Sequence, residues 1–443
     1  METGRTSLMY QEMVCRAACF GARWRPVTRS EPVVGAASRP RTARRSWAAL
    51  LVVALTALSV MVSAPVARAD IPLPDNDPFY AAPADLAAQP DGAVLGSRPI
   101  SLFDLPIPVS AWQLRYRTTD STDSPLLDVA TVIVPPVPWV GPRPLLSYQV
   151  PEDSLGTRCA PSFALRGARD WGVVNTVLDV PFLMEALRRG WAVVVADYEG
   201  PQSRFFDGVT AGRAVLDGIR AARSFPPAGV GDGPVGAWGY SGGAFATLWA
   251  AQLRAEYAPD VWFSGISSGG VPADIPAIAQ RVDGGVQAGL AILILIALAR
   301  NNPDSGLLEL LNERGRALLA DNATACGSDL VPKYAGARVD DFSTVPNLLA
   351  HPVFRATAAP HELGAAVPDV PLYLYHGVTD DVIPVAGFSA LVDSYCAQGA
   401  DLTAIHSPFP SHNGAAIGEA FGGMNFLSDR FAGIPPVPGC VVR

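Results

Sequence analysis

A glycine-rich turn between a predicted strand and a predicted helix constrains this chain most. The turn reads GYSGG around Ser241, with the apolar run 234–238 before it and the helix-forming segment 244–253 after it. A G-x-S-x-G motif in this context marks a catalytic serine, because the sharp turn holds the hydroxyl at a helix N-terminus. Gly239 and Gly243 allow the strand and the helix to pass closely. We therefore predict that Ser241 is a nucleophile.

The chain contains a second match to the same pattern, GISSG at 265–269. It follows another apolar run, but Pro272 and Pro276 come soon after it and disfavour an immediate helix. We interpret Ser267 as part of the next strand and prefer Ser241. The alternative for Ser241 is a glycine-rich turn without chemistry.

The first 69 residues are predicted to be a leader with a signal peptide that is cleaved after Ala69. Arginines between 39 and 45 precede the apolar run 47–62, and Ala67-Arg68-Ala69 is a small-x-small cleavage motif. The apolar run is shorter than the ~20 residues of a membrane-spanning helix, so a retained membrane anchor is the less favoured alternative. We expect residues 70–443 to be secreted.

The charge of the remaining chain excludes some partners. The full chain has 33 basic and 41 acidic residues, and removing the ten Arg and three Glu of the leader leaves 23 and 38, a net charge of −15. Such a chain is poorly suited to nucleic acid and to anionic membrane surfaces.

Cysteine content agrees with export. Cys159, Cys326, Cys396 and Cys440 follow the leader, an even number for an oxidising compartment. None has the C-x-x-C spacing of a metal site, so we expect two disulfides and no metal. The sequence alone leaves three pairings open.

Strand-length apolar runs alternate with helical stretches, which predicts a mostly parallel sheet with helices on both faces. The predicted strands are 112–117, 127–135, 145–150, 192–196, 235–238, 262–266, 372–375 and 402–406. The predicted helices are 175–189, 210–224, 244–256 and 385–395.

A long helix-rich interruption, residues 272–360, separates the last two predicted strands from the others and suggests an inserted cap or lid. Within it, 285–299 is almost uniformly apolar. This stretch is either a packed cap helix, a lid or acyl-binding surface, or a membrane-inserting segment, although at ~24 Å it is short for a bilayer. Transient contact of the cap with a lipid surface follows from the second alternative.

A serine nucleophile needs a histidine base and a carboxylate that orients the base. In this fold class the order along the chain is serine, acid, histidine. Asp380, in the loop after the seventh predicted strand, is preferred over Asp381. His412 is preferred over His406, because we expect it in a Pro- and Gly-bounded loop that can reach the serine.

The other histidines have simpler interpretations. His376 precedes the acid loop and is expected to pack or hydrogen-bond beneath the site. His351 and His361 lie near the end of the cap and are expected to be surface or core residues.

With these residues in order, the chain resembles the secretory lipase family, which includes the fungal lipase A-type enzymes. The resemblance extends over 75–440. It rests on YQVPEDS at 148–154 with CAPS at 159–162, DYEGP at 197–201, the acid loop GVTDDVIP at 377–384, and FLSDRFAG at 426–433. The family usually has tryptophan where this chain has Phe426.

The resemblance implies an α/β-hydrolase fold for residues 70–443, with a helical lid inserted at 272–360. It implies an oxyanion hole made by Asp153 and the backbone N–H of Gly242. A contact from Asp153 requires its main-chain N–H or a protonated carboxyl, because a carboxylate would repel the oxyanion. It also implies the disulfides Cys159–Cys326 and Cys396–Cys440.

Together these features predict a secreted serine ester hydrolase, a lipase acting on triacylglycerols and other fatty-acyl esters, that needs no cofactor. An acyltransferase or polyester hydrolase with the same triad is an alternative, and so is a catalytically silent binding protein of this fold. A peptidase is less favoured, because the chain has no propeller-like repeat.

Overall fold

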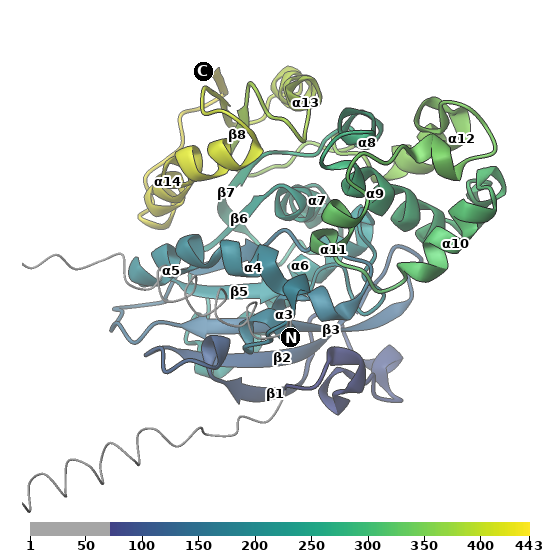
Figure 1. The fold of residues 1–443 in the computed structure, drawn as a ribbon. Helices are drawn as coiled ribbons and strands as arrows, with labels where there is room; N and C mark the ends of the chain where they lie inside the picture. The colour runs from purple at the N-terminus through teal and green to yellow at the C-terminus, as the bar shows by residue number, and fades with distance from the viewer. Residues whose placement is uncertain (1–70) are drawn as a thin grey trace, which may run out of the picture. The chain divides into compact units, whose positions relative to one another are not determined.

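The computed structural model describes residues 71–443, and the predicted leader therefore lies outside the described residues. These residues form a ten-stranded sheet in the order β1-β2-β3-β5-β4-β6-β7-β8-β9-β10 (Figure 1). Strands β1, β2 and β3 pair in antiparallel fashion, β3 pairs with β5 in the same way, and the remaining pairs are parallel. The strands are β1 (Val94–Ile100), β2 (Ser110–Thr119), β3 (Pro125–Val134), β4 (Leu145–Gln149), β5 (Ala192–Ala196), β6 (Val235–Tyr240), β7 (Phe263–Gly269), β8 (Leu372–Gly377), β9 (Leu402–Ser407) and β10 (Cys440–Val442).

The eight predicted strands correspond to β2 through β9, so the prediction of a mostly parallel sheet is confirmed. Both edge strands were missed. Strand β1 contains Gly96 and Pro99, two residue types depleted in strands, and β10 is only three residues long. Ser267 lies inside β7 and is fully buried, as expected for a strand residue.

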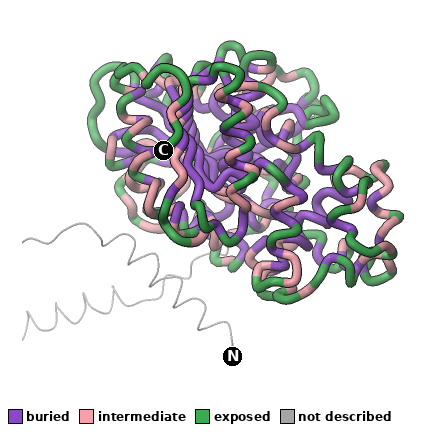
Figure 2. The backbone as a smooth tube through the Cα atoms, turned by 90° about the horizontal axis from the view of Figure 1, so that it is seen from above, coloured by how far each residue is buried: buried purple, intermediate pink, exposed green. Residues whose placement is uncertain are grey.

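Helices cover both faces of the sheet, and alternate strand residues pack against them. In β5, Val193 and Val195 pack in the cluster that includes α5 and α14, whereas Val194 packs in the cluster with α6 and α7. Figure 2 shows the buried backbone gathered in the interior and the exposed backbone along the outside. The helices outside the insertion are α3 (Pro161–Leu165), α4 (Val174–Leu178), α5 (Val180–Arg188), α6 (Gly208–Ser224), α7 (Gly242–Tyr257), α13 (Val385–Ala397) and α14 (His412–Phe431).

The predicted helical segment 175–189 is helical in the structure, but it is divided into two helices. The chain forms two helices, α4 and α5, that meet at Asp179. Pro181 lies in the first turn of α5, where it lacks the N–H that a continuous helix would need and restricts the residue before it. Asp179, between the two helices, keeps helical torsion angles, and its N–H still donates to the carbonyl oxygen of Asn175 at 3.3 Å, so the interruption is one residue long.

The segment between β7 and β8 is helical. It contains α8 (Ile275–Val282), α9 (Ala288–Asn301), α10 (Glu313–Asp321), α11 (Gly327–Lys333) and α12 (Pro352–Ala358). The apolar side chains of α9 from 291 to 299 are buried in the same hydrophobic cluster as α6 and α7. Helix α9 is thus part of the packed core, which favours the packed-helix alternative over an exposed acyl-binding surface.

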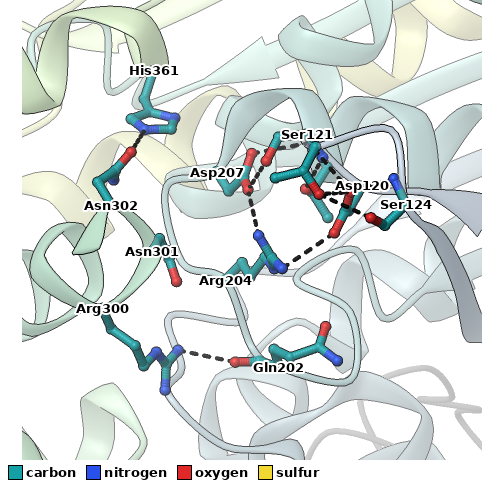
Figure 3. A network of polar contacts seen from close by, with 12 residues as sticks. Asp120, Ser121, Ser124, Gln202, Arg204, Asp207, Arg300, Asn301, Asn302 and His361 are labelled. Carbon is teal, nitrogen blue, oxygen red and sulfur yellow. Dashed lines mark hydrogen bonds and ion pairs between the residues drawn. The ribbon is translucent and has the colours of Figure 1, made fainter. Parts of the chain in front are cut away.

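Polar contacts join this inserted segment to the loop after β5 (Figure 3). Arg300, at the end of α9, donates to the carbonyl oxygen of Gln202 at 3.0 Å. Arg204 in the same loop pairs with Asp120 at 3.2 Å and with Asp207 at 3.6 Å. The loop is therefore held between the insertion and the β2–β3 turn.

The structure contains the two disulfides that the resemblance implies. Cys159, before α3, is bonded to Cys326, at the start of α11, and their Cα atoms lie 5.8 Å apart. Cys396 of α13 is bonded to Cys440 of β10, with Cα atoms 5.5 Å apart. Bonds of this kind persist in oxidising compartments. In residues 71–443, helices long and apolar enough to cross a bilayer are absent.

Candidate active site

Ser241 occupies a strained turn between β6 and α7. Its φ of 54° and ψ of −123° lie in a region that non-glycine residues rarely adopt. The backbone N–H of Ser241 donates to the carbonyl oxygen of Gly269 at the end of β7, at 2.9 Å. The neighbouring strand thus fixes the turn that presents this side chain at the carboxyl edge of the sheet.

Two glycines make the turn possible. A Cβ at Gly239 would collide with the carbonyl oxygen of Gly243, and a Cβ at Gly243 would collide with the carbonyl oxygen of Gln149. Helix α7 therefore begins in direct backbone contact with the ends of β4 and β6. The first N–H groups of α7 have no intrahelical acceptor, and they carry the positive end of the helix dipole.

Asp380 and His412 are in contact. Asp380 lies in the loop after β8, and its Oδ2 is 2.7 Å from Nδ1 of His412. Its Oδ1 accepts the backbone N–H groups of Val382 at 2.9 Å and Ile383 at 2.8 Å. Burial alone would raise the pKa of Asp380, but the hydrogen bond and charge of His412, with the Ile383 N–H, outweigh it and lower that pKa. Asp380 is therefore held as a carboxylate against the imidazole ring.

His412 is the first residue of α14, so the expectation that it lies in a loop was wrong. Ser411 caps the helix by accepting the N–H of Gly414 at 3.2 Å, with a φ of 65°. Asp381 accepts the backbone N–H of His412 at 2.9 Å, and the hydroxyl of Tyr240 donates to its carbonyl oxygen at 2.6 Å. The histidine is thus positioned through both its ring and its backbone.

The remaining histidines are engaged elsewhere. His376 is fully buried, with Nε2 2.9 Å from the carbonyl oxygen of Ile383 and 3.6 Å from Oδ2 of Asp380. Nε2 of His406 lies 3.0 Å from the Ser389 hydroxyl. His351 caps α12, and His361 contacts Asn302, visible in Figure 3.

Ser241 and His412 line one pocket of about 560 Å³. Asp153, Tyr240 and residues of α4, α5 and α14 complete its lining. Most of these wall residues are apolar, as is usual for small-molecule sites. The pocket is bordered by α14 and the α4–α5 pair rather than by α9.

Asp153 lies beside the first turn of α7. A Cβ on Gly242 would collide with its Oδ1, and Asn175 donates to its Oδ2 at 3.3 Å. The N–H of Gly327, in the inserted segment, donates to the carbonyl oxygen of Asp153 at 2.8 Å. Burial raises the pKa of Asp153 to about 6, although the nearby charge of His412 opposes this.

Sequence reasoning missed two features of the site. Asp381 and Tyr240 hold the backbone of His412, a role that no motif indicated. A cluster of buried carboxyl groups also lies behind Asp153: Glu199 accepts from the N–H and the hydroxyl of Ser154 at 3.1 and 2.7 Å. Glu152 is buried with both carboxyl oxygens lacking a hydrogen-bond partner within the described chain.

The arrangement provides the parts needed for acyl transfer. It combines a serine on a strained turn, an imidazole in the same pocket, a carboxylate on the far ring nitrogen, and N–H donors at a helix start. Groups of three or more His, Cys, Asp or Glu placed to bind a metal are absent from residues 71–443.

Comparisons with known proteins agree on one family. The family model described as "Secretory lipase" matches residues 167–439. A Mycobacterium tuberculosis protein named "Probable inactive lipase" is 38% identical over 373 residues, covering 82% of this chain and 83% of the relative. Lipase A of Moesziomyces aphidis is 32% identical and covers 90% of each chain.

A solved structure shares the fold. The X-ray structure of Candida antarctica lipase A in its closed state superposes with a TM-score of 0.78 at 31% identity. The match covers 85% of this chain and 91% of that chain. The chain therefore belongs to the secretory lipase family and has the α/β-hydrolase fold of its members.

Proposed function

We propose that this protein is a secreted serine ester hydrolase, a lipase that cleaves fatty-acyl esters such as triacylglycerols. The observation that carries the proposal is the placement of Ser241 and His412 in one apolar pocket, with Asp380 on Nδ1 of the histidine. Family membership supports a lipid ester hydrolase in general. The particular substrate and the role of each residue are our proposal.

In the proposed reaction, the Ser241 hydroxyl oxygen attacks the ester carbonyl carbon while Nε2 of His412 takes the hydroxyl proton. Asp380 holds the ring in the orientation and tautomer that leaves Nε2 free to accept. The tetrahedral intermediate then collapses, and His412 gives its proton to the leaving alcohol. Water attacks the acyl-serine by the same steps and releases the fatty acid.

The oxyanion of each intermediate lies at the start of α7 in this proposal. The N–H of Gly242 donates to it, helped by the positive end of the helix dipole. Asp153 contributes through its main-chain N–H or as a neutral carboxyl, and the raised pKa of its carboxyl, about 6, makes the neutral form accessible in mild acid.

Export is supported by the two disulfides and by the family to which the chain belongs. We propose that residues 272–360 act as the cap of the domain. Because α9 is buried in the core, we expect the cap to stabilise the fold rather than to bind the fatty-acyl chain. The cap also positions Asp153 through the N–H of Gly327. A lipid surface would then be contacted beside the pocket, at α4 and α14.

A second candidate function is binding without catalysis. A relative that is 38% identical is named as probably inactive, so the fold can be associated with lost activity. The contact between Asp380 and His412 favours catalysis, because a binding protein needs no carboxylate on the imidazole ring.

The test is hydrolysis of p-nitrophenyl butyrate, p-nitrophenyl palmitate and an emulsified triacylglycerol by the protein. Ser241→Ala should lower kcat by roughly 10⁶-fold. Ser267→Ala, in the second GxSxG match, serves as the control and should retain activity. Ester hydrolysis that persists in Ser241→Ala, or no hydrolysis by the folded wild-type protein, would contradict the proposal.

A further inference from the structure

We infer that Asn175 of α4 is a positioning residue for the oxyanion hole, and this inference rests on the proposed function. The side-chain amide of Asn175 donates to Oδ2 of Asp153 at 3.3 Å. This hydrogen bond turns the other carboxyl oxygen, Oδ1, toward the oxyanion that forms beside Gly242. Asn175 therefore acts on the reaction through Asp153 rather than on the ester itself.

The backbone of Asp153 is held by groups other than Asn175. Its φ of 47° lies in the left-handed region, which few residues other than glycine adopt. The carbonyl oxygen of Asp153 accepts the N–H of Gly327 at 2.8 Å, and the N–H of the next residue, Ser154, donates to Glu199 at 3.1 Å. These contacts fix the main chain but do not involve the carboxyl group of Asp153. The orientation of that carboxyl group depends on Asn175.

The two oxygens of the Asp153 carboxyl have different surroundings. Oδ1 is the carboxyl oxygen nearest to Gly242, because a Cβ added to that glycine would collide with Oδ1, whereas Oδ2 lies farther away. Oδ2 accepts from the amide of Asn175. When a carboxyl group is neutral, its carbonyl oxygen is the better acceptor, so a donor on Oδ2 places the proton on Oδ1. The proton is then on the side of Gly242, where it can be donated to the oxyanion.

Helix α4 fixes the position of Asn175. The two residues that follow it, Thr176 and Val177, are buried and hold the helix against the protein interior. Asn175 instead lines the pocket that contains Ser241, as Asp153 does. The amide is thus presented to the Asp153 carboxyl from a packed helix.

Other titratable groups also face Asp153. His412 belongs to α14, Asp179 follows α4, and Glu199 lies in the turn after β5. Burial raises the pKa of Asp179 to about 7 and the pKa of Glu199 to about 8. Burial also raises the pKa of Tyr198, so its hydroxyl stays neutral. A pH effect therefore belongs to Asp153 only if it disappears when the carboxyl of Asp153 is removed.

The experiment measures kcat and KM for p-nitrophenyl butyrate at pH 5 and pH 8 in the wild-type protein, Asn175→Ala and Asn175→Asp. The aspartate has nearly the shape of asparagine but offers a carboxyl oxygen in place of the amide donor. Asn175→Ala is also made in the background of Asp153→Ala, which removes the carboxyl and keeps the main-chain N–H. The matched controls are Asn425→Ala and Asn425→Asp, because Asn425 is an exposed asparagine of α14 whose side-chain oxygen accepts from Arg189 at 2.9 Å.

At pH 5 the Asp153 carboxyl is mostly neutral, because its pKa is about 6. Asn175→Ala should then lower kcat about tenfold, less than the roughly 10²- to 10³-fold cost of removing an oxyanion donor outright. Asn175→Asp should lower kcat at pH 5 by at least as much, because a proton shared between two carboxyl groups is drawn to Oδ2. KM should change less than about twofold, since the contact is made in the transition state.

At pH 8 the Asp153 carboxyl is ionised and has no proton to donate. Asn175→Ala should then lower kcat less than about threefold. In the Asp153→Ala background the same substitution should change kcat less than about twofold at either pH, because its partner is missing. The two Asn425 variants should match the wild-type protein at both pH values.

Three results would overturn the inference. They are an equal loss of kcat in Asn175→Ala at both pH values, the same loss in the Asp153→Ala background, and a change confined to KM. Each would assign Asn175 to packing or to substrate binding. Absence of hydrolysis by the folded wild-type protein would reject the proposed function instead.

Circular dichroism of each variant identifies misfolding. If Asp153→Ala does not fold, Asp153→Asn replaces it as the background. The amide at position 153 does not titrate, so Asn175→Ala should then lower kcat equally at pH 5 and pH 8. A loss that still depends on pH in this background would contradict the inference, because it would come from another titrating group.

Discussion

Asp380 and Asp381 contact the same histidine in two different ways. Oδ2 of Asp380 is 2.7 Å from the ring nitrogen Nδ1 of His412, whereas Oδ1 of Asp381 accepts the backbone N–H of His412 at 2.9 Å. One carboxylate therefore acts on the imidazole ring, and the other holds the start of α14. The two adjacent residues form a matched pair for mutation.

Asp380→Asn should lower kcat by about 10⁴-fold, because an amide at this position favours the wrong imidazole tautomer and does not stabilise the imidazolium. Asp381→Asn should lower kcat less than tenfold, since its amide oxygen can still accept the backbone N–H. Steady-state kinetics on p-nitrophenyl butyrate measures both. Equal losses in the two variants would show that Asp380 has no special role.

The role of the Asp153 carboxyl can be tested by pH. Burial raises its pKa to about 6, so the neutral form that can donate to an oxyanion disappears as the pH rises from 5 to 8. The amide of Asp153→Asn remains a donor over this range. The ratio of kcat for the variant to kcat for wild type should therefore increase with pH. A ratio that does not change with pH would assign the contact to the main-chain N–H.

Glu152 should reduce stability at alkaline pH. Burial, followed by the charges of Glu199 and Asp197, raises its pKa well above the usual value. When folding raises the pKa of a carboxyl, that carboxyl ionises at a lower pH in the unfolded chain than in the folded protein. As the pH rises above the unfolded pKa, ionisation therefore favours the unfolded state, and the free energy of unfolding falls. Glu152→Gln should thus increase Tm relative to wild type more at pH 8 than at pH 4.5. The exposed Glu256→Gln should show no such trend in differential scanning calorimetry.

The two disulfides should differ in their effect on activity. Removing either pair by double alanine substitution should cost about 2–5 kcal/mol of unfolding free energy. Cys326 adjoins Gly327, whose N–H holds the carbonyl of Asp153 at 2.8 Å, so loss of Cys159–Cys326 should also lower kcat. Loss of Cys396–Cys440 should leave kcat within twofold. Urea unfolding measures the two losses of unfolding free energy, and steady-state kinetics at a temperature where both variants remain folded measures kcat. A larger loss of kcat in the variant without Cys396–Cys440 would contradict the prediction.

The sequence was sufficient for the parts of this fold that depend on local patterns. Apolar runs located β4 to β9, because buried parallel strands are continuous in hydrophobicity. The antiparallel strands β2 and β3 were also located by their apolar runs. The GYSGG turn could be located because a side chain at Gly239 or Gly243 would collide with backbone atoms, so few residues other than glycine fit there. The expected chain order of serine, acid and histidine then limited the candidate acid and base to residues after Ser241, which led to Asp380 and His412.

Features that depend on tertiary contacts were not predictable in the same way. His412 follows Pro408 and Pro410, which indicated a loop, but capping by Ser411 and the contact with Asp381 start a helix there. The apolar stretch 285–299 fits a core helix and a lid equally well, and only its packing against α6 and α7 separates the two. Glu152 lies in the YQVPEDS motif, but only tertiary packing shows that its carboxyl is buried without a hydrogen-bond partner in residues 71–443.

The most direct test of the account is detection of the acyl-enzyme. The protein is mixed with p-nitrophenyl butyrate, quenched in acid within the first turnovers, digested and examined by mass spectrometry. We predict a butyryl adduct on the peptide that contains Ser241, and no adduct in Ser241→Ala. A butyryl group on another residue, such as Ser267, or hydrolysis without any adduct under conditions that trap acyl-serine in a known serine esterase, would contradict the central claim.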